Sequence, residues 1–318
     1  MGDGRWEMET GSPRHSSFRP SCVSAVPHSR EAKRGQSLTL PPHRTVPLFA
    51  FLRSGRPADR QSGRPAVDTT GASGVSSAVS TLVVIPARYA STRLPGKPLH
   101  LLNGKPMVQW VWEAAARVEG VEVLVATEDA RIVDAVKKFG GRAVLTSPDC
   151  ASGTDRVAEA AANTSAEFII NLQGDEPTFT PESVAIVAQA LRRGEGMATL
   201  DVALDAALAP DPNIVKVVKD ARGYALYFSR SPLPYPRNPF TGYRKHLGIY
   251  GYRRDVLHRF VGLPQTELEK AESLEQLRAL ENGILIYVAE SPSDSVSVDT
   301  AADALQAEAL LQRAGPGR

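Results

Sequence analysis

From Thr81 onward the chain alternates short β-branched apolar runs with amphipathic helical patterns, and this alternation limits the possible folds more than any other feature. The apolar runs fall at 82–85, 121–126, 143–146 and 168–172, and the helical patterns at 107–118, 132–139 and 156–162. Strands that are apolar on both faces and separated by helices form parallel sheets, because right-handed crossovers cover both faces with helices. The pattern therefore predicts an α/β fold with a mostly parallel central sheet and a site at the carboxyl ends of its strands.

The rhythm changes in the second half of the chain. After a helix at 181–193 we expect a hairpin of 215–219 with 225–228, a Pro-rich loop at 232–239, a strand at 247–252, a helix at 267–282, a strand at 284–289 and a last helix from Ala301. Hairpins joined to an otherwise parallel pattern indicate a small β-containing subregion beside the main sheet.

The first 79 residues differ in composition from the rest. They are rich in Ser, Arg, Pro and Gly and show no hydrophobic periodicity, so they cannot bury enough apolar surface to offset ordering entropy. We expect a disordered tail over 1–79 and one globular domain over 80–318. An Arg- and Ser-rich leader is typical of a transit peptide, but Asp3, Glu7 and Glu9 argue against one. A mis-assigned start, with synthesis beginning near Val75 or Val79, explains the tail at least as well.

Charge and cysteine content exclude several classes of partner. The tail holds 11 Lys and Arg against 6 Asp and Glu, a net charge of +5, which leaves −3 for the remainder. A slightly acidic domain gives no electrostatic reason to expect nucleic acid or an anionic membrane. The apolar run at 46–52 is broken by Pro47 and is far shorter than the roughly 18 residues that span a bilayer. The only cysteines, Cys22 and Cys150, exclude a disulfide framework, so we expect a cytoplasmic protein without nucleic-acid or membrane partners.

A basic loop directly follows the first expected strand. Residues 86–98 read P-A-R-Y-A-S-T-R-L-P-G-K-P, which places Arg88, Arg93 and Lys97 beside the hydroxyl of Ser91 and the glycine Gly96. Arg offers forked donors to phosphate oxygens, Lys a point charge, and Gly a close backbone approach. The spacing fits neither a Walker A loop nor G-x-G-x-x-G. The loop predicts a phosphate site of another kind, with a solvated basic loop as the alternative.

Two aspartates are candidates for a metal site. Asp175 follows the buried run 168–172 and Gln173, so its carboxylate emerges at the same sheet edge as the basic loop. Magnesium needs few protein carboxylates, because substrate phosphates complete its coordination. Asp299 follows an expected strand at 296–298 and precedes a helix; taken alone it favours a helix N-cap.

Other polar groups suit a nucleotide or a hydroxylated acid. Ser152, Gly153 and Thr154 precede a helix, where they either cap it or bind a nucleobase edge. Arg230 is suited to clamp a carboxylate. Further candidates for hydroxyl binding are His246, Tyr250, Glu272, Glu275 and Gln276. Taken singly, His246 is more often structural, and Glu272 and Glu275, expected on one helix face, are solvated charges in the alternative interpretation.

Taken together, these strings resemble the 3-deoxy-manno-octulosonate cytidylyltransferase family over almost all of residues 81–313. The shared segments, in order, are V-V-I-P-A-R-Y-A-S-T-R-L-P-G-K-P-L, N-G-K-P-M, S-G-T-D-R, Q-G-D-E-P, Y-A-L-Y-F-S-R, H-L-G-I-Y-G-Y, L-E-Q-L-R and V-D-T. Each segment is weak alone, but their number and order exclude coincidence. One departure is Cys150, at a position where the family usually has His.

The resemblance implies a Rossmann-like nucleotidyltransferase fold whose β-containing subregion serves dimerisation and sugar binding. It implies that CMP passes from CTP to the anomeric hydroxyl of the acidic sugar Kdo, for lipopolysaccharide synthesis, with release of pyrophosphate and no covalent intermediate. By the same resemblance, Asp175 and Asp299 hold Mg²⁺, and Arg93 and Lys97 join them as catalytic residues.

The other implied contacts divide between the two substrates. The nucleotide set is Arg88, Ser91, Arg93, Lys97, Ser152, Gly153, Thr154 and Gln173. The sugar set is Arg230, His246, Tyr250, Glu275 and Gln276. A homodimer is implied as well. Two alternatives stay open: a cytidylyltransferase for another acidic sugar such as sialic acid, and a catalytically silent nucleotide-binding protein.

Overall fold

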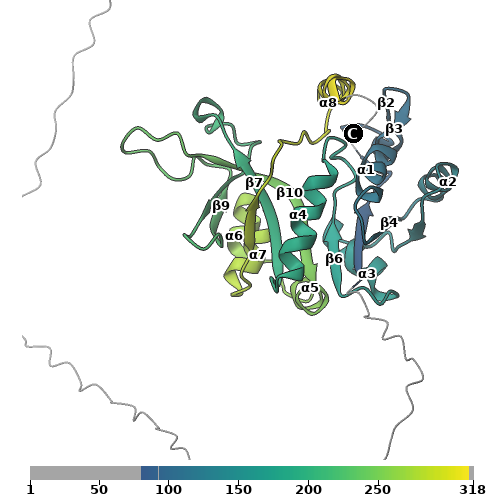
Figure 1. Cartoon of the computed structure of the whole chain (residues 1–318), viewed down its shortest axis with the longest axis horizontal. Helices are drawn as coiled ribbons and strands as arrows, with labels where there is room; N and C mark the ends of the chain where they lie inside the picture. Colours follow the sequence, from purple (N-terminus) through teal and green to yellow (C-terminus); the bar gives the residue numbers. More distant parts are fainter. Residues whose placement is uncertain (1–79, 92, 315–318) are drawn as a thin grey trace, which may run out of the picture. The chain divides into compact units, whose positions relative to one another are not determined.

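The structure, a computed structural model, describes residues 80–91 and 93–314 (Figure 1). All of these lie in one compact unit, Gly71–Arg318. The disordered tail expected over 1–79 lies outside the described residues. The first part of the fold contains β1 (Thr81–Pro86), η1 (Lys97–Leu99), β2 (Leu101–Leu102), β3 (Lys105–Pro106), α1 (Met107–Ala116), β4 (Val121–Thr127), α2 (Ala130–Lys138), β5 (Ala143–Leu145), α3 (Gly153–Ala162), β6 (Phe168–Asn171) and α4 (Pro181–Arg192).

The second part contains β7 (Met197–Ala203), η2 (Ala206–Leu208), β8 (Lys216–Lys219), β9 (Ala225–Ser229), β10 (Arg244–Arg253), α5 (Arg254–Val261), α6 (Glu267–Glu272), α7 (Gln276–Glu281), β11 (Tyr287–Glu290) and α8 (Ala301–Ala314). No helix in the described ranges is long and apolar enough to cross a membrane.

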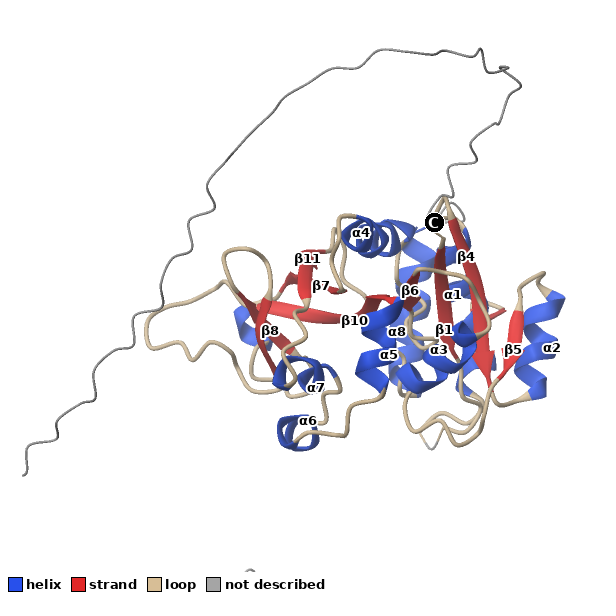
Figure 2. Cartoon of the chain, turned by 90° about the horizontal axis from the view of Figure 1, so that it is seen from below, coloured by secondary structure: helices blue, strands red, loops and turns tan. Residues whose placement is uncertain are grey.

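The central sheet has the order β11-β7-β10-β6-β1-β4-β5 (Figure 2). β1 runs parallel to both β4 and β6, and β4 runs parallel to β5. β10 is antiparallel to its neighbours β6 and β7, whereas β11 is parallel to β7. The β8–β9 hairpin joins this sheet through the pairing of Lys216 with Lys245 on β10. The mostly parallel α/β sheet predicted from the alternation is therefore confirmed.

The sheet divides the core into two halves. Along β1, Leu82 and Val84 face one half, and Val83 and Ile85 face the other, because successive strand side chains point to opposite faces. Residues of α3, α5 and α7 fill the first half, and residues of α1, α2 and α4 fill the second. Each fully buried Val, Leu or Ile contributes about 1.5–3 kcal/mol, so burial on both faces fixes the sheet and with it the positions of the strand ends.

A small separate core holds the C-terminal helix near the basic loop. Leu94, Leu102, Val298 and Ala307 are buried together there, which joins the loop after β1, the β2–β3 hairpin and α8. Glu308 of α8 accepts a hydrogen bond from the backbone N–H of Asn103 at 2.8 Å. This contact fixes α8 to the β2–β3 hairpin, and so holds Asp299, two residues before α8, near the loop that follows β1.

Several expected elements differ from the structure. The helix expected over 267–282 is two helices, because Ser273 adopts a left-handed conformation (φ 51°) between α6 and α7. Glu272 and Glu275 therefore do not share a helix face, and that expectation is wrong. β11 begins at Tyr287 and not at 284, since Ile286 pairs through its carbonyl with Ala225 and not with β7.

The strand expected at 296–298 is also wrong, because that segment forms no strand and its N–H groups bond instead to the Asp175 carbonyl and the Thr178 hydroxyl. Of the longer elements, β7 and α5 were not predicted. The short elements η1, β2, β3 and η2 were not predicted either. β7 carries Asp201, fully buried between Lys219 (2.8 Å) and Arg244 (2.7 Å), and this charge interrupts the apolar pattern that marks a buried strand. α5 follows β10 without an intervening turn residue.

Candidate active site

The candidate site lies where β1 and β6 end. The basic loop leaves β1, and the segment from Gln173 to Glu176 leaves the neighbouring strand β6. The backbone N–H of Val298 donates to the carbonyl of Asp175 at 2.9 Å, which brings the segment before α8 to the same place. Three stretches that are distant in sequence thus meet at the carboxyl edge of the parallel strands, as predicted for this fold class.

The loop geometry depends on Gly96 and Tyr89. Gly96 has φ +66°, in the left-handed region, and an added Cβ would lie 3.2 Å from the Tyr89 hydroxyl. The backbone N–H of Tyr89 donates to Glu128 at 2.9 Å, and the Arg131 guanidinium stacks on the Tyr89 ring at 3.4 Å. These contacts turn the chain so that Arg93 and Lys97 face the cavity.

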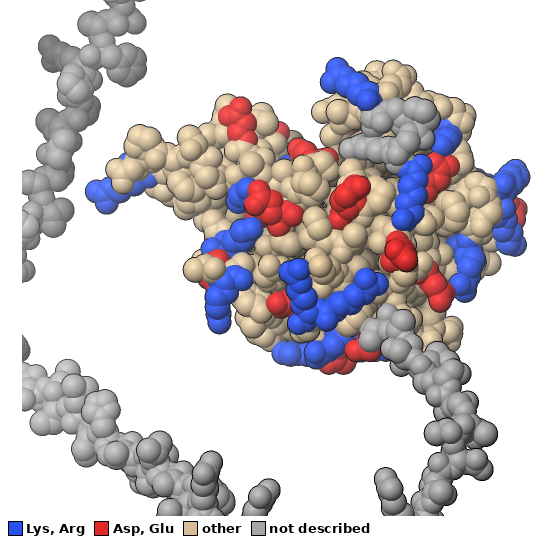
Figure 3. Space-filling model, in the orientation of Figure 1, with Lys and Arg blue, Asp and Glu red and all other residues tan. Residues whose placement is uncertain are grey.

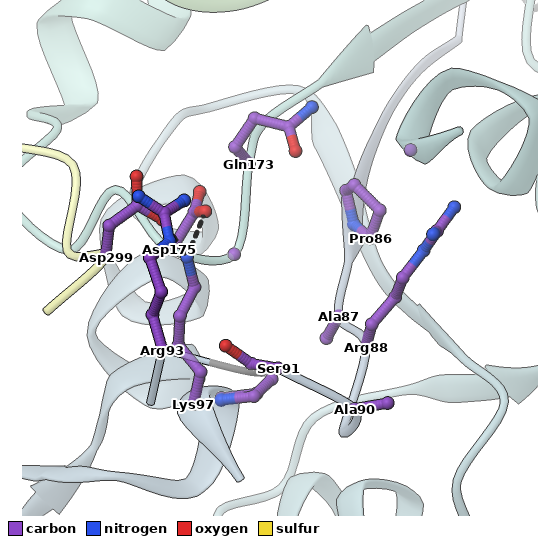
Figure 4. A pocket seen from close by; sticks show the side chains of 13 residues that line it. Pro86, Ala87, Arg88, Ala90, Ser91, Arg93, Lys97, Gln173, Asp175 and Asp299 are labelled. Carbon is purple, nitrogen blue, oxygen red and sulfur yellow. Dashed lines mark hydrogen bonds and ion pairs between the residues drawn. The ribbon is translucent and has the colours of Figure 1, made fainter. Parts of the chain in front are cut away.

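Lys97 lies between the two aspartates. Its ammonium nitrogen is 2.6 Å from Asp175 Oδ2 and 2.9 Å from Asp299 Oδ1, and Arg93 Nη2 is 3.1 Å from the same Asp299 oxygen (Figure 4). Burial lowers the pKa of Lys97, but attraction and hydrogen bonds from Asp175 and Asp299 outweigh it and raise the pKa above its ordinary value. Lys97 is therefore a fixed cation at neutral pH.

These residues line a cavity of about 370 Å³. Its wall includes Arg88, Ser91, Arg93, Lys97, Gly153, Gln173, Asp175 and Asp299. In Figure 4, Arg93, Lys97, Asp175 and Asp299 gather on one side and Arg88 extends on the other. Arg88 Nη2 donates to the Cys150 carbonyl at 2.8 Å, and Gln173 Nε2 donates to Asn171 Oδ1 at 2.9 Å. The cavity thus combines one end that carries Arg93, Lys97 and both carboxylates with another polar end that carries Arg88 and Gln173.

The remaining residues of the predicted nucleotide set lie at the start of α3. Ser152 caps this helix in a capping box with Asp155. Thr154 is buried and donates to Glu275 at 2.6 Å. Gly153 lacks a Cβ that would lie 3.4 Å from the Gln173 amide, so the helix start approaches the cavity wall closely. Of the three, only Gly153 lines the cavity, and nucleotide contacts by Ser152 and Thr154 stay predictions.

The pair Asp175 and Asp299 suits a divalent cation. Two carboxylates from separate segments share one cation, the Lys97 ammonium, which marks the space between them as favourable for positive charge. No group of three or more His, Cys, Asp or Glu side chains able to hold a metal occurs among the described residues. A hard cation here would need further oxygen ligands, which substrate phosphates provide for magnesium.

A second cavity of about 680 Å³ adjoins the first and shares Arg93 and Asp299 with it. Its wall includes Lys245 and His246 of β10, the segment 211–215 and Glu176. His246 Nε2 is 3.0 Å from Thr199 Oγ1, and burial lowers the pKa of His246 to about 3, so this imidazole is neutral. Because both cavities share Asp299, a polar ligand in the second cavity would lie beside the Asp299 end of the first.

The predicted sugar set is only partly brought together. Tyr250 packs on the His246 ring at 5.3 Å between centroids, but Tyr250, Glu275 and Gln276 line neither cavity. Glu275 accepts from Thr154 at 2.6 Å, and its Oε1 atom lies 3.6 Å from Arg278 Nη2. Gln276 is buried on α7. Arg230 lines neither cavity: its guanidinium donates to the carbonyls of Glu272 (2.8 Å) and Pro212 (3.0 Å). Its role as a carboxylate clamp stays a prediction.

Sequence reasoning missed four charged residues of the second cavity, namely Glu176, Asp211, Lys245 and Asp303. Lys245 Nζ donates to Asp294 Oδ1 at 2.8 Å and to the Ser295 carbonyl at 2.9 Å. Burial and the charge of Asp175 raise the pKa of Glu176 to about 7. The available signal was the charged residue Glu176 itself, inside Q-G-D-E-P at a buried strand end.

Comparison with known proteins decides the family. The cytidylyltransferase family model matches residues 82–286. The 3-deoxy-manno-octulosonate cytidylyltransferase of Escherichia coli is 50% identical over 234 residues, 72% of this chain and 95% of that protein. This chain belongs to the 3-deoxy-manno-octulosonate cytidylyltransferase family. Another member of the family, from Pseudomonas fluorescens, is 48% identical over 72% of this chain and 97% of its own length.

Solved structures support the same family and fold. A CMP:2-keto-3-deoxy-manno-octonic acid synthetase complexed with CTP is 49% identical, with a TM-score of 0.72 over 74% of this chain and 100% of its own. A glucose-1-phosphate thymidylyltransferase from Bacillus anthracis, only 16% identical, has a TM-score of 0.57 and shares the fold alone. The predicted membership of the 3-deoxy-manno-octulosonate cytidylyltransferases and the nucleotidyltransferase fold are both confirmed.

Proposed function

We propose that this protein transfers CMP from CTP to the anomeric hydroxyl of Kdo, giving CMP-Kdo and pyrophosphate and so activating Kdo for lipopolysaccharide synthesis. The observation that carries the proposal is the pair of adjoining cavities, with Arg93 and Asp299 in the wall of both. A nucleotide in one and a sugar acid in the other would meet at these shared residues.

The first cavity takes CTP in this proposal. Arg88, Ser91, Gly153 and Gln173 line the end suited to the nucleoside, together with the helix start at 152–154. Arg93 and Lys97 supply positive charge for the phosphates. Lys97 then exchanges carboxylate partners for phosphate oxygens, which are acceptors of the same kind.

Asp175 and Asp299 would hold Mg²⁺, whose chemistry here is to neutralise phosphate charge and lower the pKa of the attacking hydroxyl. The two carboxylates fit this role because they come from separate segments and converge on one cation. Arg93 and Lys97 neutralise the leaving pyrophosphate. No described side chain needs to act as a nucleophile, so catalysis rests on positioning and electrostatics.

The second cavity takes the sugar acid. Neutral His246 on its wall is suited to bind a hydroxyl. Tyr250 contacts the His246 ring, and Tyr250, Glu275 and Gln276 complete the proposed sugar set without lining the cavity themselves. Arg230 belongs to the proposed sugar set as well. Its guanidinium donates to the carbonyls of Glu272 and Pro212, and through Pro212 it supports the segment 211–215 in the cavity wall. The protein would act in the cytoplasm, where CTP is available.

The experiment is incubation of the purified protein with CTP, Mg²⁺ and, separately, Kdo and sialic acid, followed by product mass and pyrophosphate release. We expect CMP-Kdo and stoichiometric pyrophosphate. A CMP-sialic acid product alone would replace the acceptor in the proposal. CTP binding without any product would show a nucleotide-binding protein that lacks the reaction.

We also propose a homodimer. Large apolar side chains are exposed on β9 and on the loop that follows it, namely Leu226 (62%), Tyr235 (84%) and Phe240 (38%). This loop projects away from the sheet in Figure 1. A projecting apolar segment of this kind is typical of a subunit interface.

A further inference from the structure

A buried carboxyl group in the wall of the second cavity has no assigned role. Glu176 lines this cavity with only 9% of its surface exposed, and its Oε2 atom is buried without a hydrogen-bond partner. A buried polar atom left without a partner is destabilising, so proteins keep such atoms mainly where a ligand or water completes them. Oε2 therefore marks a point where a polar ligand atom belongs.

The surroundings of Glu176 are arranged to make room for this carboxyl. Gly248 on β10 lies against it, and a Cβ at Gly248 would be 3.3 Å from Glu176 Oε1. Any larger side chain at 248 would press on the carboxyl group. Lys245 and His246, from the same strand, line the cavity beside it and add one ammonium and one neutral imidazole.

The same cavity distinguishes Glu176 from its neighbour Asp175. Asp175 lines the first cavity and pairs with Lys97, whereas Glu176 lines only the second and pairs with no cation among the described residues. These adjacent residues thus line different cavities. The wall around Glu176 is polar, which suits a ligand rich in hydroxyl groups and not an apolar one.

We propose that Glu176 binds a hydroxyl group of the acceptor sugar and so determines which sugar acid the enzyme accepts. This inference rests on the proposed function. A carboxyl oxygen accepts a hydrogen bond from a sugar hydroxyl. Because Glu176 lines only the second cavity, it acts in recognition of the acceptor sugar and not in phosphoryl transfer. When a sugar analogue lacks the bound hydroxyl, the polar group of the site is left without a partner. Such a contact therefore discriminates strongly between the sugar and the analogue.

The test begins with Glu176→Met, which keeps the bulk and removes the hydrogen bond. We expect KM for Kdo to rise about tenfold to a hundredfold, as for loss of a buried hydrogen bond to a carboxyl group. KM for CTP and the Mg²⁺ concentration for half-maximal activity should stay within about twofold. A matched control is Glu195→Met, whose carboxylate binds only the Tyr224 hydroxyl among the described residues and lines neither cavity; it should change none of these constants.

Kdo analogues that each lack one hydroxyl identify the contact. One analogue should be a poor substrate for the wild-type enzyme, yet lose nothing further in Glu176→Met, because variant and analogue remove the same interaction. Additive losses for every analogue would overturn the proposal. An unchanged KM for Kdo in Glu176→Met would also overturn the proposal. So would an equal rise in KM for CTP and in the Mg²⁺ concentration for half-maximal activity, because that effect would act through the neighbouring Asp175.

Gly248→Ala gives an independent test that does not remove the carboxyl. The added methyl group should displace Glu176 and raise KM for Kdo severalfold with KM for CTP unchanged. If Glu176→Met fails to fold, this variant decides alone, and unchanged KM for Kdo in it would overturn the proposal. Wild-type production of CMP-Kdo is measured first, so failure of the proposed function is distinguished from failure of this inference.

Discussion

At the scale of single residues, the site depends on Lys97 between Asp175 and Asp299. The three side chains come from three segments, and two contacts of 2.6 and 2.9 Å hold them together. The sequence predicted each of these residues from strand-end position and family resemblance. It did not predict the ammonium between the carboxylates, because a direct contact between residues so far apart in the chain depends on the packing of α8.

Asp175→Asn tests the role of this carboxylate. The amide keeps the shape but removes the charge that would hold Mg²⁺, so we expect kcat to fall at least about a hundredfold even at saturating Mg²⁺. Pyrophosphate release measures the rate. Asp220→Asn, in the β8–β9 turn, is a matched control and should leave it unchanged. Near-normal turnover of Asp175→Asn would remove the proposed metal role.

The thiol of Cys150 gives a prediction of pH dependence. Burial and the nearby Glu159, whose carboxylate accepts its hydrogen bond at 3.1 Å, raise the pKa of Cys150 from 9.0 to about 11. Only the thiolate reacts with alkylating agents, so the rate of iodoacetamide labelling of Cys150 should rise about ninefold between pH 9 and 10. Peptide mass spectrometry follows the rate at this site. A rise of less than about twofold, as for a thiol with an ordinary pKa, would show that the pKa is not raised.

At the scale of elements, the sequence predicted those whose pattern is purely apolar. β1 and β6 are buried along their whole length, and their runs are unbroken. β7 was missed because its buried Asp201 is neutralised by Lys219 and Arg244 from other strands, a compensation that only the tertiary structure contains. The helix break at Ser273 was missed because serine gives no sign of a left-handed conformation.

Packing of α4 on β10 depends on Gly251. A Cβ there would lie 2.5 Å from Val187 Cγ1 and 2.9 Å from Leu191 Cδ1, so the helix must shift to admit a methyl group. We expect Gly251→Ala to lower the free energy of unfolding by about 1–3 kcal/mol in urea titration. Gly262→Ala, with contacts of 3.5 Å or more and no left-handed φ, is the matched control and should change it by less than about 0.5 kcal/mol. Equal stability of both variants would contradict this packing.

At the scale of the whole molecule, the sequence predicted the fold and the first cavity better than the second cavity. The basic loop and Asp175 follow strands, so topology alone places them together. The second cavity is built from β10, the segment 211–215 and the segment before α8, whose approach depends on long-range packing. Lys245 was missed for that reason, whereas Glu176 follows β6 and could have been predicted from its position at the strand end. Charged side chains of both signs are interspersed on the face in Figure 3.

Association of two chains is the prediction at this scale. Because Tyr235 and Phe240 expose apolar surface on the projecting loop, we expect a solution mass of two chains by light scattering coupled to gel filtration. Replacing both with Ser should shift the mass toward one chain. Leu305→Ser, an equally exposed apolar residue on α8, is the control and should leave the mass unchanged. A wild-type mass of one chain would contradict the dimer.

The central claim is that the basic loop and the two aspartates form one site for metal-bound CTP. The most direct measurement is a crystal structure with CTP and Mn²⁺, read by anomalous scattering from the metal. We predict an anomalous peak between the carboxylates of Asp175 and Asp299, with the Lys97 ammonium moved onto a phosphate oxygen. A peak remote from both aspartates, or CTP bound while Lys97 keeps its two carboxylate contacts, would contradict the account.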